Sequence, residues 1–256
     1  ANFSRMLYTA GQPSRAAQMA ERGLRISGSA GPATELDAIL QGNRARALVE
    51  LGRFDEAKAL TEKALASALE RKDTRWAGTF ALYGGPAWCS TGDAARCESM
   101  LATAREKLTE ALPAGHPTLG LVEVLAARVS IARGQPSAAR EQLQRALAIL
   151  DAAKDKPPQR VAARALLARL DAEAGDAANA SANAAQAVAE ARVVSRGFAS
   201  TEWLGAALVA QAIVLRAGGV AAGATQALRE GAAQLTGAVG ADAPATREAE
   251  ALLAGT

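Results

Sequence analysis

The chain has 256 residues, of which 29 are basic and 26 acidic, for a formal net charge of +3 and a pI near 9.1. Half of the residues are hydrophobic but only 4% are aromatic, so the core is built chiefly from alanine, leucine and valine. Such a core favours closely packed helices, and the scarcity of strand-forming residues argues against a sheet. Because charges of both signs are interspersed, we expect no nucleic-acid partner.

The termini and the cysteine count bear on location. No apolar run approaches the roughly 18–20 residues that a membrane span needs, and no signal peptide is visible, so no membrane partner is expected. The sequence begins at Ala1 without a methionine, and we expect a fragment of a longer protein. Two cysteines are too few for a disulfide framework, which favours a reducing, cytoplasmic location.

Glycines recur along the chain at a nearly constant interval. Residues 52–65 hold the clearest pattern: Gly52, an aromatic residue two positions later, then Ala57 and Ala64. Equivalent turns fall at Gly11, Gly52, Gly92, Gly134, Gly175 and either Gly218 or Gly219, at intervals of 41, 40, 42, 41 and 43 or 44 by subtraction. Such spacing is typical of stacked helical repeats that cannot bury their apolar faces alone.

We therefore expect one repeat domain over residues 1–256. Proline at the predicted helix starts Pro32 and Pro117 suits the first helical turn, where its missing N–H is not needed. The last segment is either a capping helix or a truncated repeat. The expected repeats are residues 1–31 (incomplete), 32–73, 74–116, 117–157, 158–199 and 200–239, followed by residues 240–256.

The third repeat carries an unusual first helix. Gly84, Gly85 and Pro86 lie between Tyr83 and Trp88. Proline inside a helix removes one hydrogen bond and clashes with the preceding turn, so we predict a kink or break near residues 82–85. One interpretation is a tolerated kink. The other is a bend that opens a small-molecule pocket lined by Tyr83 and Trp88.

With these features the sequence resembles the tetratricopeptide repeat family. The family places a small residue in the middle of the first helix, glycine at the turn, and alanines five and twelve residues after the glycine. The mid-helix position falls on Ala45, Gly85, Ala127, Ala168 and, if Gly219 is the turn, Ala212. The later alanines fall on Ala57 and Ala64, Ala139 and Ala146, and Ala180 and Ala187, with Cys97 and Ala104 in the third repeat.

The longer period and the start Gly115-His116-Pro117 are similar to the kinesin light chain type of repeat. The turn aromatic, however, is present only as Phe54. The resemblance implies an all-α, right-handed superhelical solenoid of antiparallel helix pairs whose first helices line a concave groove. Similar arrays occur as regulatory or sensor parts of bacterial signalling proteins.

By the same resemblance, groove-facing positions lie six residues before each turn glycine. These positions carry Arg46, Pro86, Arg128, Arg169 and, if Gly219 is the turn, Ile213; we call the three arginines the basic strip. Guanidinium pairs bidentately with carboxylate and phosphate, so the strip suits an acidic peptide. The alternative is that each arginine pairs with a nearby glutamate or is solvated. The expected partner-binding residues are Asn43, Arg46, Tyr83, Trp88, Arg128, Arg169 and Arg216.

Few residues of the sequence are suited to catalysis or to metal binding. His116 is the only histidine, and its place beside Pro117 suggests helix capping or simple exposure. Cys89 and Cys97 flank the turn at Gly92 and are either two buried or half-buried thiols or a redox bridge. No phosphate-binding loop is present. We expect no catalytic residues, no metal and no cofactor.

The sequence thus predicts a non-catalytic protein–protein interaction module that binds a protein or acidic peptide. Two alternatives remain. One is self-association into a homo-oligomer through apolar ends at Met6, Leu7, Leu252 and Leu253. The other is a small-molecule sensor that uses the third repeat.

Overall fold

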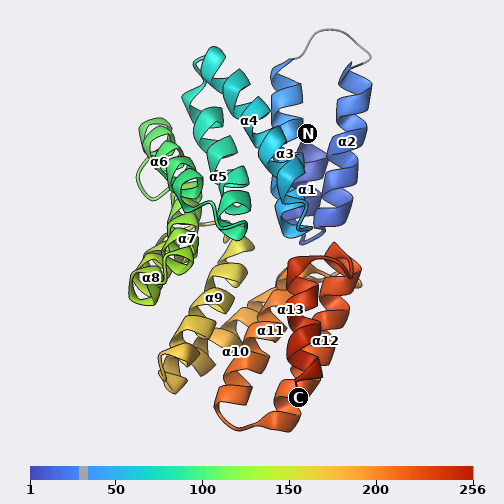
Figure 1. Cartoon of the computed structure of the whole chain (residues 1–256), viewed down its shortest axis with the longest axis vertical. Helices are drawn as coiled ribbons and strands as arrows, with labels where there is room; N and C mark the ends of the chain where they lie inside the picture. Colours follow the sequence, from blue (N-terminus) through green and yellow to red (C-terminus); the bar gives the residue numbers. More distant parts are fainter. Residues whose placement is uncertain (29–33, 256) are drawn as a thin grey trace. The chain divides into compact units, whose positions relative to one another are not determined.

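The computed structural model describes residues 1–28 and 34–255, and within these residues it contains thirteen helices and no strand (Figure 1). The predicted all-α class is therefore confirmed. The helices are α1 Asn2–Thr9, α2 Pro13–Gly28, α3 Glu35–Glu50, α4 Phe54–Glu70, α5 Thr74–Ser90, α6 Ala94–Ala111, α7 Pro117–Ala132, α8 Pro136–Ala152, α9 Gln159–Glu173, α10 Ala177–Val194, α11 Glu202–Ala217, α12 Ala221–Val239 and α13 Pro244–Ala254.

The predicted glycine turns are present, each at the end of a first helix. Gly52 and Gly92 have φ of 73° and 78°, a left-handed backbone that glycine adopts without steric cost. In the last of these turns Gly219, at φ 76°, is the left-handed residue, whereas Gly218 has φ −83°. The next N–H then closes the turn, as where Asp93 N donates to the carbonyl of Trp88 at 3.1 Å. The repeat interval thus reflects one recurring helix ending.

Second helices start with side-chain caps in several repeats. The carboxylates of Asp93 and Asp176 accept the backbone N–H three residues later, which satisfies a donor that has no partner within the helix. The first helix α7 is capped by His116, whose Nδ1 accepts from the N–H of Thr118, two residues later, at 3.2 Å, and Pro117 opens that helix as predicted. The predicted start at Pro32 lies outside the described residues. The described part of that helix begins at Glu35, where Thr34 and Asp37 form a capping box.

Small side chains bring the helices of each hairpin close together. Ala57 and Ala64 are fully buried on α4, and Ala139 and Ala146 are fully buried on α8. Ala45 and Ala127, the mid-helix positions of α3 and α7, are equally buried. A methyl group at these positions lets neighbouring backbones approach, which is what the alanine pattern predicted.

The contacts divide the chain into two compact units, which are described separately. Unit 1 comprises Ala1–Tyr8 and Pro13–Ala153, and unit 2 comprises Thr9–Gln12 and Lys154–Thr256. The core of unit 1 gathers large side chains from α5, α6 and α7 around Phe80, Trp88, Met100, Leu108 and Leu125. The single repeat domain over residues 1–256 remains a prediction.

Unit 2 packs around Trp203, which is 2% exposed. The Trp203 indole N–H donates to the carbonyl of Thr9 at 2.9 Å, and Glu202 N donates to the carbonyl of Gly11 at 3.0 Å. A Cβ on Gly11 would lie 2.7 Å from the Trp203 ring, so this position admits only glycine. A second cluster joins Ala212, Ala224, Ala227 and Leu228 with Leu252 and Leu253 of α13.

The predicted break in the third repeat is wrong. Helix α5 continues through Pro86 from Thr74 to Ser90. Gly84 and Gly85 explain why the helix is kept, because they let α5 lie directly against its neighbours: a Cβ on Gly84 would collide with Thr61 of α4, and one on Gly85 would lie 3.0 Å from Leu125 of α7. Packing on both sides holds the helical path that proline alone disfavours. None of the helices in the described residues is long and apolar enough to cross a membrane.

Candidate interaction site

Arg46, on α3 of unit 1, lies between two aromatic rings. Its guanidinium carbon is 3.9 Å from the ring centroid of Tyr8, on α1, and 4.4 Å from that of Tyr83, on α5. Contacts of this kind contribute about 0.5–1 kcal/mol each when exposed and about 2 kcal/mol when desolvated. The two rings pack against the guanidinium, and Arg46 is partly buried.

The charge of Arg46 has no carboxylate partner of its own. Within the described residues Arg46 forms no ion pair, and the nearby Glu50 accepts a hydrogen bond from the Tyr8 hydroxyl at 3.1 Å. Burial lowers the pKa of Arg46, but Tyr8, Tyr83 and the carboxylate of Glu50 together raise it above the ordinary value, so the group stays cationic. The site is therefore a fixed, permanently charged donor edge.

Asn43 holds α1 against α3. Its amide Nδ2 donates to the carbonyl of Ala1 at 3.3 Å and to the hydroxyl of Ser4 at 3.2 Å, and Asn43 is 7% exposed. A buried amide with its donors satisfied positions its neighbours rather than contacting a partner. Asn43 therefore acts indirectly, by placing the α1 helix that carries Tyr8.

Arg128, on α7, is the second residue of the basic strip in unit 1. It is partly exposed, and within residues 1–28 and 34–255 its side chain forms no hydrogen bond or ion pair. Its neighbour along the helix, Arg133, pairs instead with Glu98 of α6. The guanidinium donors of Arg128 are therefore not used by the described part of the chain.

Trp88, which was expected to line a pocket, belongs to the core. Its side chain is 4% exposed, and Arg96 lies over its ring at 5.6 Å. Since α5 is unbroken and Trp88 is buried beside Phe80 and Met100, Trp88 packs in the core and does not line an open pocket, and a small-molecule site at the third repeat remains a prediction. Tyr83 is partly buried and contacts Arg46.

In unit 2 the predicted arginines are both engaged by α13. Arg169, on α9, pairs bidentately with Glu248, with N–O distances of 2.5 and 3.2 Å. Arg216, at the end of α11, donates to the carbonyl of Leu252 at 2.7 Å. For Arg169 the alternative of pairing with a nearby glutamate is therefore the one that the structure adopts.

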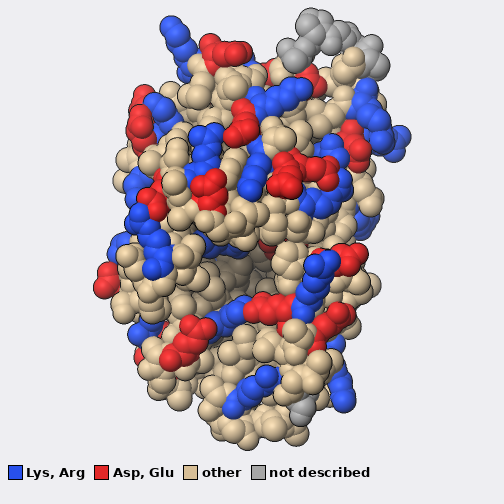
Figure 2. Space-filling view, viewed as in Figure 1, with Lys and Arg blue, Asp and Glu red and all other residues tan. Residues whose placement is uncertain are grey.

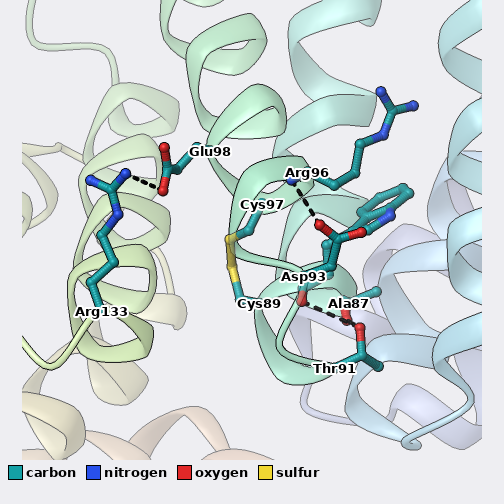
Figure 3. The surroundings of a disulfide bond; sticks show 9 residues. Ala87, Cys89, Thr91, Asp93, Arg96, Cys97, Glu98 and Arg133 are labelled. Carbon is teal, nitrogen blue, oxygen red and sulfur yellow. Dashed lines mark hydrogen bonds and ion pairs between the residues drawn. A yellow bond between two sulfur atoms is a disulfide. The ribbon is translucent and has the colours of Figure 1, made fainter.

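Cys89 and Cys97 form a disulfide between the end of α5 and the start of α6 (Figure 3). Their Cα atoms are 5.1 Å apart, Cys97 is fully buried, and Cys89 is partly exposed. Of the two sequence interpretations, the structure thus shows the bridge. The argument from few cysteines for a reducing compartment no longer holds, and a cytoplasmic location remains a prediction.

No group of three or more histidine, cysteine, aspartate or glutamate residues is placed to hold a metal ion within residues 1–28 and 34–255. On the face shown in Figure 2, basic and acidic side chains are interspersed rather than gathered by sign. A specific contact therefore depends on single well-placed charges.

Tyr8 and Glu248 are the site residues that sequence reasoning missed. A signal for Tyr8 existed: the chain has only two tyrosines, and Tyr8 lies three residues before a turn glycine, on a first helix like Tyr83. For Glu248 no such signal existed, because its partner Arg169 lies 79 residues away on a different repeat.

No protein-family model and no curated protein matches the chain, but solved structures do. A Rap protein in complex with competence and sporulation factor superposes with a TM-score of 0.69 at 11% identity, covering 98% of this chain and 74% of that one. The BtubC (BKLC) protein from P. vanneervenii has a TM-score of 0.60 at 14% identity, covering 97% and 92%. A putative kinesin light chain with TPR-like repeats from Podosopora anserina has a TM-score of 0.53 at 22% identity, covering 77% and 94%. At these identities the similarity establishes the fold, a tetratricopeptide-like helical repeat.

Proposed function

We propose that this tetratricopeptide-like repeat protein is a non-catalytic interaction module that binds an acidic segment of a partner protein through the first helices of unit 1. The observation that carries the proposal is Arg46, whose guanidinium is held between Tyr8 and Tyr83 without a carboxylate of its own. The Rap protein of the same fold was solved in complex with a factor, which is consistent with a binding role.

The chemistry of Arg46 favours a carboxylate. Stacking fixes the guanidinium plane before binding, so little side-chain freedom is lost when its edge pairs with a planar acidic group. Hydrogen bonds of this charge-assisted, bidentate kind are shorter and stronger than neutral ones. Arg128 offers a second cation on α7, and a peptide with acidic residues at two positions would use both.

Binding is measured with short peptides that carry two glutamates at varied spacing, each matched by a version with glutamine. We expect the full chain to bind at least one acidic member and not its glutamine counterpart, in fluorescence anisotropy at low salt. Arg128→Glu lowers that affinity about tenfold or more, which corresponds to ~1.4 kcal/mol. Arg46→Lys also weakens binding, because lysine keeps the charge but loses the planar donor edge.

The control is Arg192→Glu, which makes the same charge change at an exposed position of α10, in unit 2. It should leave the affinity within about twofold, since an exposed charge that is not part of the proposed site acts only through a screened field. Equal binding of glutamate and glutamine peptides, or equal losses for Arg128→Glu and Arg192→Glu, would refute the proposal. Self-association remains a separate prediction, although Leu7 is 6% exposed and Leu252 and Leu253 pack within unit 2.

A further inference from the structure

Helix α13 meets unit 2 through two arginines on one face. Arg169 binds the side chain of Glu248, and Arg216 binds the carbonyl of Leu252, one helical turn further along. Residues four apart share a helix face, so the two arginines from α9 and α11 contact successive turns of α13. They recognise one acidic side chain and one backbone carbonyl of a helix.

An apolar contact lies next to the two arginines. Leu252 and Leu253 are partly buried against Ala212 of α11 and Ala227 and Leu228 of α12. We define the α13 seat as Arg169, Arg216, Ala212, Ala227 and Leu228. Helix α13, which occupies this seat, carries Glu248 four residues before the pair Leu252 and Leu253. The α13 seat therefore suits a helix with the sequence pattern E-x-x-x-L-L.

The attachment of α13 is weak for its size. The fully buried positions of the helix are Thr246 and Ala249, whose small side chains remove little apolar area from water. The Arg169 and Glu248 side chains are 32% and 40% exposed, so water and salt screen their pair. An isolated helix of 11 residues is itself marginal.

The connection to α12 permits α13 to leave. Gly240 ends α12 with φ +96°, and the exposed residues Ala241 and Asp242 follow it. At this turn the hydroxyl of Thr246 donates to the Gly240 carbonyl at 2.7 Å, and the backbone N–H of Ala243 donates to the same carbonyl at 3.4 Å. Local opening of a weakly attached element requires far less free energy than global unfolding.

The geometry points to the α13 seat as a binding surface for an acidic amphipathic helix of a partner protein, with α13 as its exchangeable intramolecular occupant. The partner helix supplies a glutamate to Arg169, a carbonyl to Arg216, and leucines to the apolar part of the seat. This surface lies wholly in unit 2, and its existence does not depend on the role proposed for Arg46 and Arg128.

The test uses a fluorescent peptide of residues 241–255 added to the full chain. Glu248→Ala in the chain removes the side chain that holds α13 to Arg169, so the peptide should bind this variant about tenfold more tightly than the unaltered chain. Glu250→Ala is the matched control, because Glu250 is exposed on the same helix and forms no ion pair in the described residues. It should leave peptide binding unchanged.

Two further measurements test whether binding needs both Arg169 and the leucine contacts. Adding Arg169→Ala to the Glu248→Ala chain should abolish the gain, and an oligoglutamate peptide without leucines should bind at least tenfold more weakly than the α13 peptide. A gain that survives Arg169→Ala, equal binding to all chains, or equal binding of oligoglutamate would overturn the proposal. Hydrogen exchange of the unaltered chain gives an independent reading: α13 should exchange before α11 and α12, and protection of α13 equal to theirs would also overturn it.

Discussion

Arg46 and Arg169 occupy equivalent positions, six residues before their turn glycines, yet they have different surroundings. Arg46 lies between two tyrosine rings, and the nearby Glu50 carboxylate accepts from Tyr8. Arg169 is neutralised by Glu248. An arginine in a repeat position is therefore a candidate anchor only where the neighbouring helices contribute no carboxylate. In this chain that condition is met in unit 1.

Asp37 provides a prediction about pH. Hydrogen bonds from Ser27 and the backbone N–H of Thr34 hold the pKa of Asp37 below its ordinary value of 3.8, although burial opposes them. The folded-state pKa is thus lower than the unfolded one, so the ionised carboxylate stabilises the fold above pH ~4. This contribution is lost as the pH falls through the lowered folded-state value.

Asp37→Asn should therefore lower the free energy of unfolding by about 1 kcal/mol at neutral pH, the usual contribution of a helix cap. In urea titrations the difference from the unaltered chain should shrink as the pH drops below 3.8. Asp55→Asn, at an exposed place in the first turn of α4, is the control and should cost only a few tenths of a kcal/mol. Equal losses for both variants would mean that helix-dipole charge, not the capping box, matters.

The sequence correctly predicted the roles of those residues whose environment is set by local backbone geometry. Gly52 and Ala57 follow from the backbone of one turn and the packing of one hairpin, so their roles could be read from spacing alone. Trp88 could not be assigned correctly, because burial of an aromatic residue depends on which helices cover it. The roles of Tyr8 and Glu248 arise from contacts between different repeats, which spacing does not encode.

The elements are helical hairpins whose turns are each fixed by several independent bonds. In the α5–α6 turn, the hydroxyl of Thr91 donates to the carbonyl of Ala87 at 3.1 Å, and Asp93 caps α6. The disulfide between Cys89 and Cys97 joins the same two helices (Figure 3). The disulfide therefore adds a covalent link to a turn whose conformation is already held by hydrogen bonds.

We predict that reduction of this disulfide leaves the helices intact and lowers stability. Closing a loop of eight residues removes unfolded-state entropy equivalent to roughly 2–3 kcal/mol. Circular dichroism should show unchanged helical content after reduction, with a lower urea midpoint. Cys97→Ala should reproduce the loss, because alanine is the usual residue at this fully buried position.

Thiol labelling followed by mass spectrometry is the direct check on the bond itself. The chain purified without reductant should carry no reactive thiol until it is reduced. Two labelled cysteines before reduction would contradict the disulfide, and loss of helical content after reduction would contradict the role given to Thr91 and Asp93.

The chain divides into two compact units, and within each unit the helices of one hairpin contact those of the next, as α4 contacts α5 in unit 1 and α10 contacts α11 in unit 2. In arrays of this kind stability is close to a sum of repeat terms and nearest-neighbour terms. A local defect should therefore weaken its own unit most.

Gly84→Ala and Gly205→Ala form a pair that tests this expectation. A Cβ on Gly84 would collide with Thr61 in unit 1, and one on Gly205 would lie 2.6 Å from Leu235 in unit 2. Each should cost about 1–3 kcal/mol through overpacking. In hydrogen exchange, Gly84→Ala should reduce protection mainly in α3 to α7, and Gly205→Ala mainly in α9 to α12.

Gly28→Ala is the control, since nothing lies within 4 Å of its added Cβ, and it should leave protection unchanged. Uniform loss of protection over both units from either variant would show that the chain unfolds as one cooperative body, contrary to the nearest-neighbour expectation.

The stacking of Arg46 has a practical consequence for anyone who shortens this chain. Tyr8, one of its two covering rings, lies within the first eight residues, and Asn43 keeps that segment in place through Ala1 and Ser4. An expression fragment that starts at α2 would look complete by repeat boundaries, yet its Arg46 would have one face bare and would sample many rotamers. Such a fragment would give misleadingly weak affinities in a partner screen.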